Sequence, residues 1–328
     1  MSRFGVYVHL PFCASKCDYC AFATWTDRGH LVESYVSALR TEIDRAVADA
    51  MPVADSVFVG GGTPTLLPGA DLAAVIGAIP VADGAEITVE CNPDDVTVEL
   101  LHTYRDAGVN RVSLGVQSMS THVLSSLGRT HDQRNVDRAV SAVRTAGIPT
   151  FNLDLIYGAA GESIDDWRHT VTAALALEPP HVSAYGLTVE AGTPLASQPD
   201  RHPDEDDQAD KYELVDDLLT AAGLDNYEVS NWARPGHESR HNRLYWNQGD
   251  YRGFGCAAHS HQAGRRWWNL RTPDRYIEAI TRGGTVEASS ETLDADTRRF
   301  ERLELALRTR DGVPVDAFSA DTLELLEG

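Results

Sequence analysis

The stretch FGVYVHLPFCASKCDYC, residues 4–20, joins a β-rich run to three closely spaced cysteines. Cys13, Cys17 and Cys20 stand at offsets of zero, four and seven, so one loop can turn all three thiols toward one point. Soft thiolates at this spacing favour zinc or an iron–sulfur cluster. A structural zinc site takes four ligands, whereas a four-iron cluster held by three cysteines leaves one iron open to an outside chelator. The spacing alone does not choose between the two metals.

The same stretch begins an alternation of short β-rich runs and longer helical patterns that continues to about residue 223. The predicted strands are 4–10, 56–60, 86–90, 111–117, 151–157 and 181–187. Helical patterns follow, for example at 35–50, 98–108 and 136–147, the last two with a glycine suited to a helix C-cap. This rhythm is typical of βα units with a parallel sheet. Because six units fall short of the eight that close a full barrel, we predict an α/β fold with a partial, open TIM-like (β/α)6 barrel.

The pattern changes beyond residue 224. A stretch rich in glycine, aromatic residues and histidine (231–268) is followed by charged helical segments near 273–282 and 294–310. We therefore predict two domains, a barrel over residues 1–224 and a smaller C-terminal α+β domain over 225–328. The sequence stops in DTLELLEG (321–328), a helical pattern with no terminator, so the second domain is expected to be incomplete.

The composition indicates the cellular compartment and the kinds of partner to expect. The formal net charge is -21, from 49 acidic and 28 basic residues, which disfavours binding to a phosphate backbone, so no nucleic-acid partner is expected. The densest acidic run, PDEDDQAD at 203–210, precedes a periodic helix whose N-terminus it complements. Three of the five cysteines lie within eight residues, which favours metal or redox chemistry in a reducing compartment. With no leader-like segment at the start of the sequence, we expect a cytoplasmic protein.

Polar residues follow the carboxyl ends of the predicted strands. In chain order they are the cysteine cluster, GGGTP (60–64), Glu90, Gln117 and Asp154. In parallel βα folds these ends meet on one face, where the βα loops assemble the reactive groups. Arg129, in LGRTH (127–131), follows the next helix and is the exception. Scattered structural residues would not favour this edge so consistently, so we predict one active site there.

The GGGTP run is compatible with two roles. Glycines let a backbone approach a ligand closely, whereas the structural alternative is a tight turn fixed by Pro64. No lysine follows the glycines, so this is not a phosphate-binding P-loop. Backbone carbonyls here can accept from an ammonium group, Arg129 can pair a carboxylate, and Glu90 or Asp154 can hold ribose hydroxyls. The implied ligand carries an ammonium group, a carboxylate and a ribose.

With these motifs the barrel portion resembles the radical S-adenosylmethionine (SAM) superfamily. Its CxxxCxxC motif matches Cys13, Cys17 and Cys20, and its glycine motif matches GGGTP. The resemblance implies a [4Fe–4S] cluster on these cysteines, SAM chelating the open iron, radical cleavage of the SAM sulfonium and an electron donor to the cluster. By residue-level match it implies SAM contacts at Tyr7, Tyr19, Gly61, Gly62, Thr63, Glu90, Gln117, Arg129 and Asp154, with Tyr19 against the adenine.

Within the superfamily the sequence resembles the branch of oxygen-independent coproporphyrinogen III oxidases and HemW heme chaperones. The resemblance continues through ECNPDD (90–95), GVQS (115–118), LGRTH (127–131) and NLDLIYG (152–158). The oxidases carry a further cysteine where this sequence has Phe22, and a longer segment before the first strand. HNRLYW (241–246) matches the HNxxYW motif of the chaperones, which implies heme binding by His241, Asn242, Tyr245 and Trp246.

The residues of the HNRLYW motif have possible structural roles, and other residues are alternative heme ligands. His241 and Asn242 can cap or hydrogen-bond a loop while the aromatic side chains pack an interface. His259, His261 and Cys256 are alternative iron ligands, and Trp267 and Trp268 add aromatic surface. Cys256 and Cys91 are expected to be small buried residues rather than cluster ligands.

We therefore expect a HemW-like heme chaperone that uses a [4Fe–4S] cluster and SAM and delivers heme to acceptor hemoproteins, some of them at the membrane. The resemblance leaves one enzymatic alternative, a coproporphyrinogen III oxidase that decarboxylates propionates in porphyrin biosynthesis; oxidase activity is not expected. A purely structural zinc scaffold would not explain why the polar residues converge with GGGTP on one face.

Overall fold

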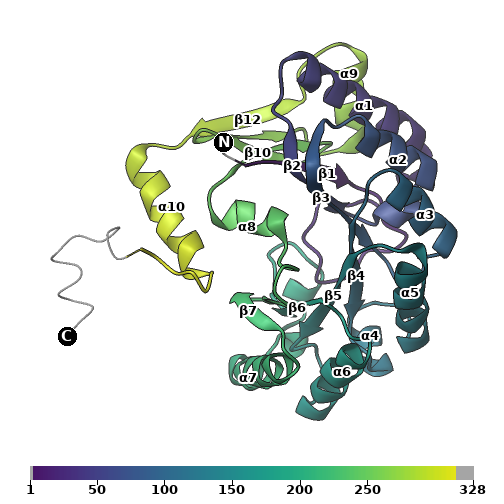
Figure 1. The fold of residues 1–328 in the computed structure, drawn as a ribbon, viewed down its shortest axis with the longest axis vertical. Coiled ribbons are helices and arrows are strands. Elements are labelled where there is room, and N and C mark those ends of the chain that lie inside the picture. The colour runs from purple at the N-terminus through teal and green to yellow at the C-terminus, as the bar shows by residue number, and fades with distance from the viewer. Residues whose placement is uncertain (1–2, 315–328) are drawn as a thin grey trace.

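The computed structural model describes residues 3–314 and contains one mixed sheet of twelve strands (Figure 1). The strands are β1 (Phe4–Leu10), β2 (Ala54–Gly61), β3 (Val81–Cys91), β4 (Arg111–Gln117), β5 (Thr150–Tyr157), β6 (His181–Gly186), β7 (Asp225–Glu228), β8 (Asn231–Ala233), β9 (Asp250–Phe254), β10 (His259–Gln262), β11 (Arg265–Asn269) and β12 (Glu287–Thr292). The α-helices are α1 (Val32–Ala48), α2 (Gly69–Gly77), α3 (Val98–Asp106), α4 (Thr121–Ser126), α5 (Gln133–Ala146), α6 (Ile164–Ala176), α7 (Glu205–Ala221), α8 (Arg240–Trp246), α9 (Pro273–Thr281) and α10 (Ala295–Leu307).

Strands β1 to β6 are parallel and lie in chain order, with helices on their outer side (Figure 1). The neighbours of β1 are β9 and β2, and those of β6 are β5 and β8, so the barrel stays open between β1 and β6. This confirms the predicted partial barrel of six units. Strands β1 and β4 have the predicted bounds. Strand β3 begins at Val81, five residues before its predicted start, because the residues around Gly84 are typical of a turn and were not predicted as strand.

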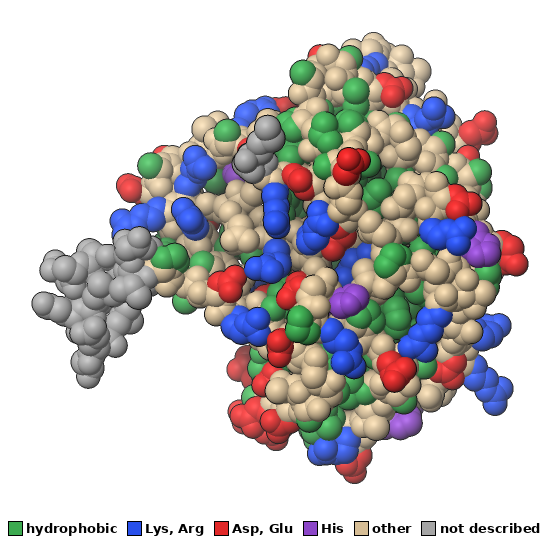
Figure 2. All heavy atoms as spheres, viewed as in Figure 1, with side chains coloured by type: hydrophobic (Ala, Val, Ile, Leu, Met, Phe, Trp, Pro, Cys, Tyr) green, Lys and Arg blue, Asp and Glu red, His purple; other side chains and the backbone are tan. Residues whose placement is uncertain are grey.

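The helix ends follow local sequence signals. Helix α5 starts with a capping box between Asp132 and Asn135 and ends at Gly147, whose φ of 72° is the left-handed conformation expected of a C-cap glycine. Helix α7 is capped by Asp204 and has three acidic residues in its first turn, as the acidic run predicts. Figure 2 shows acidic side chains gathered over this helix.

The C-terminal region adds strands to both edges of the barrel sheet. Strand β8 pairs antiparallel with β6, while β9 pairs parallel with β1 and is followed by β10, β11 and β12. Helix α8 lies between these two additions, opposite the barrel strands (Figure 1). The sheet therefore runs through the boundary predicted at residue 224, and the division into two domains stays a prediction. The predicted helical pattern at 321–328 lies outside the described residues.

The two faces of the barrel sheet differ in polarity. One face is a continuous apolar layer, for example where Val8, Val59 and Val89 occupy paired positions on β1, β2 and β3. Side chains alternate along a strand, so the intervening residues face the barrel interior. They form polar layers across the strands, such as Glu90, Ser113, Asn152 and His181. The interior therefore has the hydrogen-bonding groups needed to hold polar ligands.

A buried carboxylate ties α1 to the C-terminal region. Glu42 accepts hydrogen bonds from the Gly255 N–H at 2.9 Å, the Asn269 side-chain amide at 2.9 Å and the Tyr276 hydroxyl at 2.6 Å. We expect Glu42→Ala to lower the free energy of unfolding by about 3 kcal/mol, because it leaves three buried donors unpaired. Chemical denaturation would measure this, with Glu33→Ala, at an exposed position of the same helix, as the matched control. Equal losses in the two variants would contradict this role.

Candidate functional site

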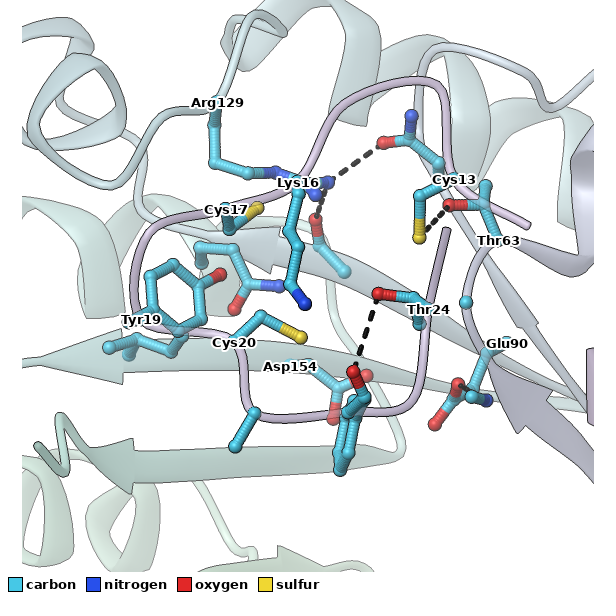
Figure 3. A pocket seen from close by; sticks show the side chains of 18 of the residues that line it. Cys13, Lys16, Cys17, Tyr19, Cys20, Thr24, Thr63, Glu90, Arg129 and Asp154 are labelled. Carbon is cyan, nitrogen blue, oxygen red and sulfur yellow. Dashed lines mark hydrogen bonds between the residues drawn. The ribbon is translucent and has the colours of Figure 1, made fainter. Parts of the chain in front are cut away.

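A cavity of about 570 Å³ lies at the carboxyl ends of the barrel strands (Figure 3). All three clustered cysteines line it. The predicted SAM residues that line it are Tyr19, Gly61, Gly62, Thr63, Glu90, Gln117, Arg129 and Asp154. Arg129 reaches it from the loop after α4, although it does not follow a strand. The structure therefore brings together all but one of the residues predicted for the cluster and for SAM.

The exception is Tyr7, whose side chain lies one layer deeper in the barrel. Its hydroxyl shares a hydrogen bond of 3.0 Å with Nδ1 of His9, and its ring stacks against Phe58 at a centroid distance of 6.4 Å. Tyr7 is not among the residues that line the cavity. A strand places alternate residues on the same inner face at different depths, and Tyr7 lies three residues before the end of β1. The structure thus gives Tyr7 no direct place in the cavity, and its SAM contact stays a prediction.

The cysteine loop is closed by backbone hydrogen bonds at its base. The Cys13 N–H donates to the Trp25 carbonyl at 3.1 Å, and the Trp25 N–H donates to the Pro11 carbonyl at 2.7 Å. Within the loop, the Cys20 N–H donates to the Cys17 carbonyl at 3.2 Å. Figure 3 shows Cys17 and Cys20 beside Tyr19, with Cys13 near Thr63. The loop therefore presents three half-buried thiols to one cavity.

The three cysteines of the loop are the candidate ligands for a cluster. Within residues 3–314, no three histidine, cysteine, aspartate or glutamate side chains converge closely enough to share one metal ion. A four-iron cluster takes one thiolate on each of three irons, so its ligands surround a larger object. Burial raises the pKa of Cys13 and Cys20, so these thiols hold their protons until a metal displaces them.

The glycine run is required by contacts within the protein. A side-chain carbon at Gly60 would lie 2.6 Å from Oε2 of Glu90, and one at Gly62 would lie 2.5 Å from the Phe12 carbonyl oxygen. Gly61 has a φ of 105° and donates its N–H to Glu90 at 3.0 Å. Pro64 then starts a 3-10 turn. Contacts within the protein thus explain the glycines, while residues 61–64 also line the cavity, and the approach of their backbone to a ligand stays a prediction.

Two carboxylates of the cavity differ in their environments. Asp154 accepts from the Ser113 hydroxyl at 2.6 Å and the Asn152 amide at 2.8 Å, although burial raises its pKa. Glu90 accepts from the Gly61 N–H. Burial, and then the negative charge of Asp154, raise the pKa of Glu90 from 4.5 to about 7. Asp154 is thus held by two side-chain donors, whereas Glu90 changes its protonation near neutral pH.

This shift predicts a pH-dependent stability. Between about pH 4.5 and 7 the folded state binds more protons at Glu90 than the unfolded state, so stability falls as the pH rises through that interval and is level above it. We expect Glu90→Gln to stabilise the cluster-free protein by about 2 kcal/mol at pH 8 and by much less at pH 5. Denaturant titrations of both proteins at the two pH values would measure this. A gain of the same size at both would show that the charge is not the cause.

Arg129 offers an unused donor in the cavity. One terminal nitrogen donates to Oδ1 of Asn92 at 2.8 Å and to the Gly115 carbonyl at 3.2 Å. Its Nε is buried and has no hydrogen-bond partner within the described part of the chain. Gln117 stands nearby at a bulge in β4 with a φ of 64°, a strained conformation that is common at ligand sites. A ligand carboxylate would satisfy the free guanidinium donor.

Further cavity residues were not predicted as site residues from the sequence. Among them are Lys16, Asn92, Ser113 and Tyr185. Tyr185 is 39% exposed and comes from the end of β6, so the strand-end rule would have found it had it been applied to aromatic residues. Asn92 directly follows the end of β3. Ser113 lies mid-strand and has no comparable signal.

The segment predicted to bind heme forms the short helix α8. His241 is fully buried, and its ring nitrogens share hydrogen bonds with the Ser56 hydroxyl at 2.9 Å and the Tyr245 hydroxyl at 2.8 Å. Burial lowers the pKa of His241 to about 3. The carboxylate of Glu86 caps the helix by accepting from the Arg240 and His241 N–H groups. His241 can therefore bind iron only if the hydrogen bond at the coordinating ring nitrogen breaks, either the one to Ser56 or the one to Tyr245.

The neighbours of α8 are mostly aromatic. Tyr245 packs edge-on against Tyr251 at 4.6 Å, and the guanidinium of Arg308 lies 4.5 Å from the Trp246 ring centre. The Asn242 N–H is used by the Ser239 cap. The structural alternative for this motif is thus realised at His241, while the heme role of the four motif residues stays a prediction.

An open six-unit barrel with three cysteines, a glycine run and two half-buried carboxylates around one cavity defines a radical SAM protein. Residues 7–174 match the family model described as Radical SAM superfamily. The sequence is 42% identical to "Heme chaperone HemW" of Mycobacterium tuberculosis (strain ATCC 25618 / H37Rv), over 99% of this chain and 86% of the relative. It is 38% identical to the protein of the same name from Escherichia coli (strain K12), over 93% of this chain and 84% of the relative. The chain belongs to the radical SAM superfamily and, within it, to the HemW family.

A solved structure supports the fold independently. "Coproporphyrinogen III oxidase (HemN) from Escherichia coli" superposes with a TM-score of 0.83, over 94% of this chain and 76% of that one. The two sequences are 24% identical, so this likeness concerns the fold. Within residues 3–314, the helices are too short or too polar to span a bilayer.

Proposed function

We propose that this protein is a heme chaperone that binds a [4Fe–4S] cluster, SAM and heme and passes heme to acceptor hemoproteins. The observation that carries the proposal is the extent of the likeness to proteins named heme chaperone, which spans 99% of the chain and therefore includes the C-terminal region. Phe22 supports it: this side chain is 62% exposed at the cavity, where the oxidase pattern has a cysteine. An acceptor hemoprotein and an electron donor to the cluster are the implied partners.

Different cavity residues would bind the cluster and the polar groups of SAM. Cys13, Cys17 and Cys20 would hold the cluster, which supplies one-electron chemistry when bound. The free donor of Arg129 pairs a carboxylate, and the Asp154 carboxylate accepts from ribose hydroxyls. Several aromatic side chains next to α8 offer flat apolar surface for a porphyrin. Heme would thus lie in the C-terminal part of the chain, outside the SAM cavity.

A heme titration of the anaerobically reconstituted protein, followed by absorption, tests the proposal. Saturable binding of one heme per chain is expected, and subsequent mixing with apomyoglobin as a model acceptor should move the heme to the acceptor. A protein that takes up no heme and instead decarboxylates coproporphyrinogen under reducing, anaerobic conditions would establish the oxidase alternative.

A further inference from the structure

The inner face of the barrel continues across the strands that the C-terminal region adds to β1. Gly5 faces this interior, because a side-chain carbon there would lie 3.2 Å from the His241 ring. Tyr251 on β9 is paired with Gly5, and His261 on β10 is paired with Tyr251. Residues two apart on a strand share a face, so His259 also belongs to this inner face.

His259 differs from the other histidines of the interior in having free ring nitrogens. Both nitrogens of His9, His181 and His241 lie within hydrogen-bond distance of a partner, and His261 is buried and bonded to the Gly249 carbonyl. His259 is exposed, and no ring nitrogen of His259 is hydrogen-bonded to any residue of the range 3–314. It can therefore bind a metal without losing a bond inside the protein.

Trp268 holds this imidazole in place. The two residues are paired across β10 and β11, and their rings stack with centroids 5.7 Å apart and planes 25° apart. Partial burial and the charge of Arg266 lower the pKa of His259, so the ring is neutral, which is the form that binds iron. A fixed, neutral and accessible imidazole has the properties of an axial heme ligand.

An aromatic wall connects this position with α8. Tyr245 contacts Tyr251, and the Tyr251 ring lies 6.3 Å from the ring of His261, two residues from His259. Although the net charge of the chain is -21, Lys and Arg side chains gather over α8 in the middle of the face shown in Figure 2. Apolar rings together with cations suit a flat apolar ligand that carries carboxylates.

We propose that His259 is the axial ligand of the heme iron and that Trp268 orients its imidazole, with the porphyrin along the wall formed by Tyr245 and Tyr251. A ring nitrogen donates its lone pair to the iron, and no electron transfer is involved. This inference rests on the proposed heme binding and assigns the iron to His259 rather than to His241.

Absorption spectra of heme-loaded variants test the assignment. His259→Ala should weaken heme binding at least about tenfold and remove the spectrum of histidine-ligated iron. His259→Cys should replace that spectrum by one of thiolate-ligated iron, a change that a merely structural role would not produce. His122→Ala, at a largely exposed histidine on α4, is the matched control and should leave the spectrum unchanged.

The outcomes separate this inference from the proposed function. If the unmodified protein binds heme and His259→Ala keeps its histidine-ligated spectrum, the ligand assignment is wrong and heme binding stands. Loss of that spectrum in His241→Ala but not in His259→Ala would likewise return the iron to α8. If the unmodified protein binds no heme at all, both the proposed function and this inference fail.

Discussion

Cys17→Ser is expected to remove the iron–sulfur cluster almost completely. Cys17 is one of the three cysteines that the loop contributes to the cavity, whose lining also includes Cys91. A cluster with two protein ligands would have two open irons instead of one. A serine hydroxyl is a much poorer donor to iron, because it does not ionise near neutral pH as a thiol does when it meets a metal. After anaerobic reconstitution, bound iron and sulfide should fall at least about tenfold, together with the visible absorption of the cluster.

The matched control for this experiment is Cys91→Ala. Cys91 is buried at the end of β3, and its sulfur lies 3.6 Å from the Val89 carbonyl oxygen. Burial, above all other causes, raises its pKa, so Cys91 is a poor thiolate. This variant should keep a full cluster even if its stability falls. A Cys17→Ser protein with as much iron and sulfide as Cys91→Ala would remove Cys17 from the ligand set.

The barrel could be predicted because its signals are local. Each parallel strand is a short β-rich run followed by a helical pattern, and β1 and β4 have the predicted limits. The pairing of β9 with β1 and of β8 with β6 was not predicted, because it joins segments far apart in the chain. Such short segments form strands because they pair with the edge of an existing sheet, and their own residues predict this only weakly.

The site residues that could be predicted are those that lie at the carboxyl ends of the parallel strands. Parallel strands place their carboxyl ends together, and this was enough for Glu90, Gln117 and Asp154. The rule says nothing about depth along a strand, so it could not separate Tyr7, below the cavity, from Tyr185, beside it. The strand-end rule predicts where a residue lies, but it does not predict which hydrogen bonds its side chain makes.

Whether His241 can bind a heme iron depends on the hydrogen bonds of its ring nitrogens. Its motif was read from the sequence, but the partner of its Nδ1 is Ser56, a residue of β2 that is 185 positions away. A chain of similar contacts joins the interior layers: the His181 ring lies 2.6 Å from the Asn152 amide oxygen and 2.8 Å from the Tyr227 hydroxyl. Whether a histidine can bind a metal is thus decided by contacts that only the fold creates.

Arg129→Leu is expected to weaken SAM binding by about 10- to 100-fold. A hydrogen bond between a guanidinium and a carboxylate contributes about 1.5–3 kcal/mol, and each 1.4 kcal/mol is a factor of ten in affinity. The buried Nε of Arg129 has no other acceptor within residues 3–314, so the loss should come mainly from the ligand. Equilibrium dialysis of SAM against the cluster-loaded protein would measure it, with Arg134→Leu, an exposed arginine of α5, as the matched control.

The contacts of Arg129 with Asn92 and Gly115 require a second variant, because their loss alone would loosen the cavity. Arg129→Lys keeps the charge but not the planar fork, so its SAM affinity should lie between those of the unmodified protein and Arg129→Leu. Iron content should be the same in all variants, since Arg129 is not a cluster ligand. If Arg129→Leu binds SAM as tightly as Arg134→Leu while holding a full cluster, the carboxylate is held elsewhere, and Lys16 becomes the remaining cation of the cavity to test.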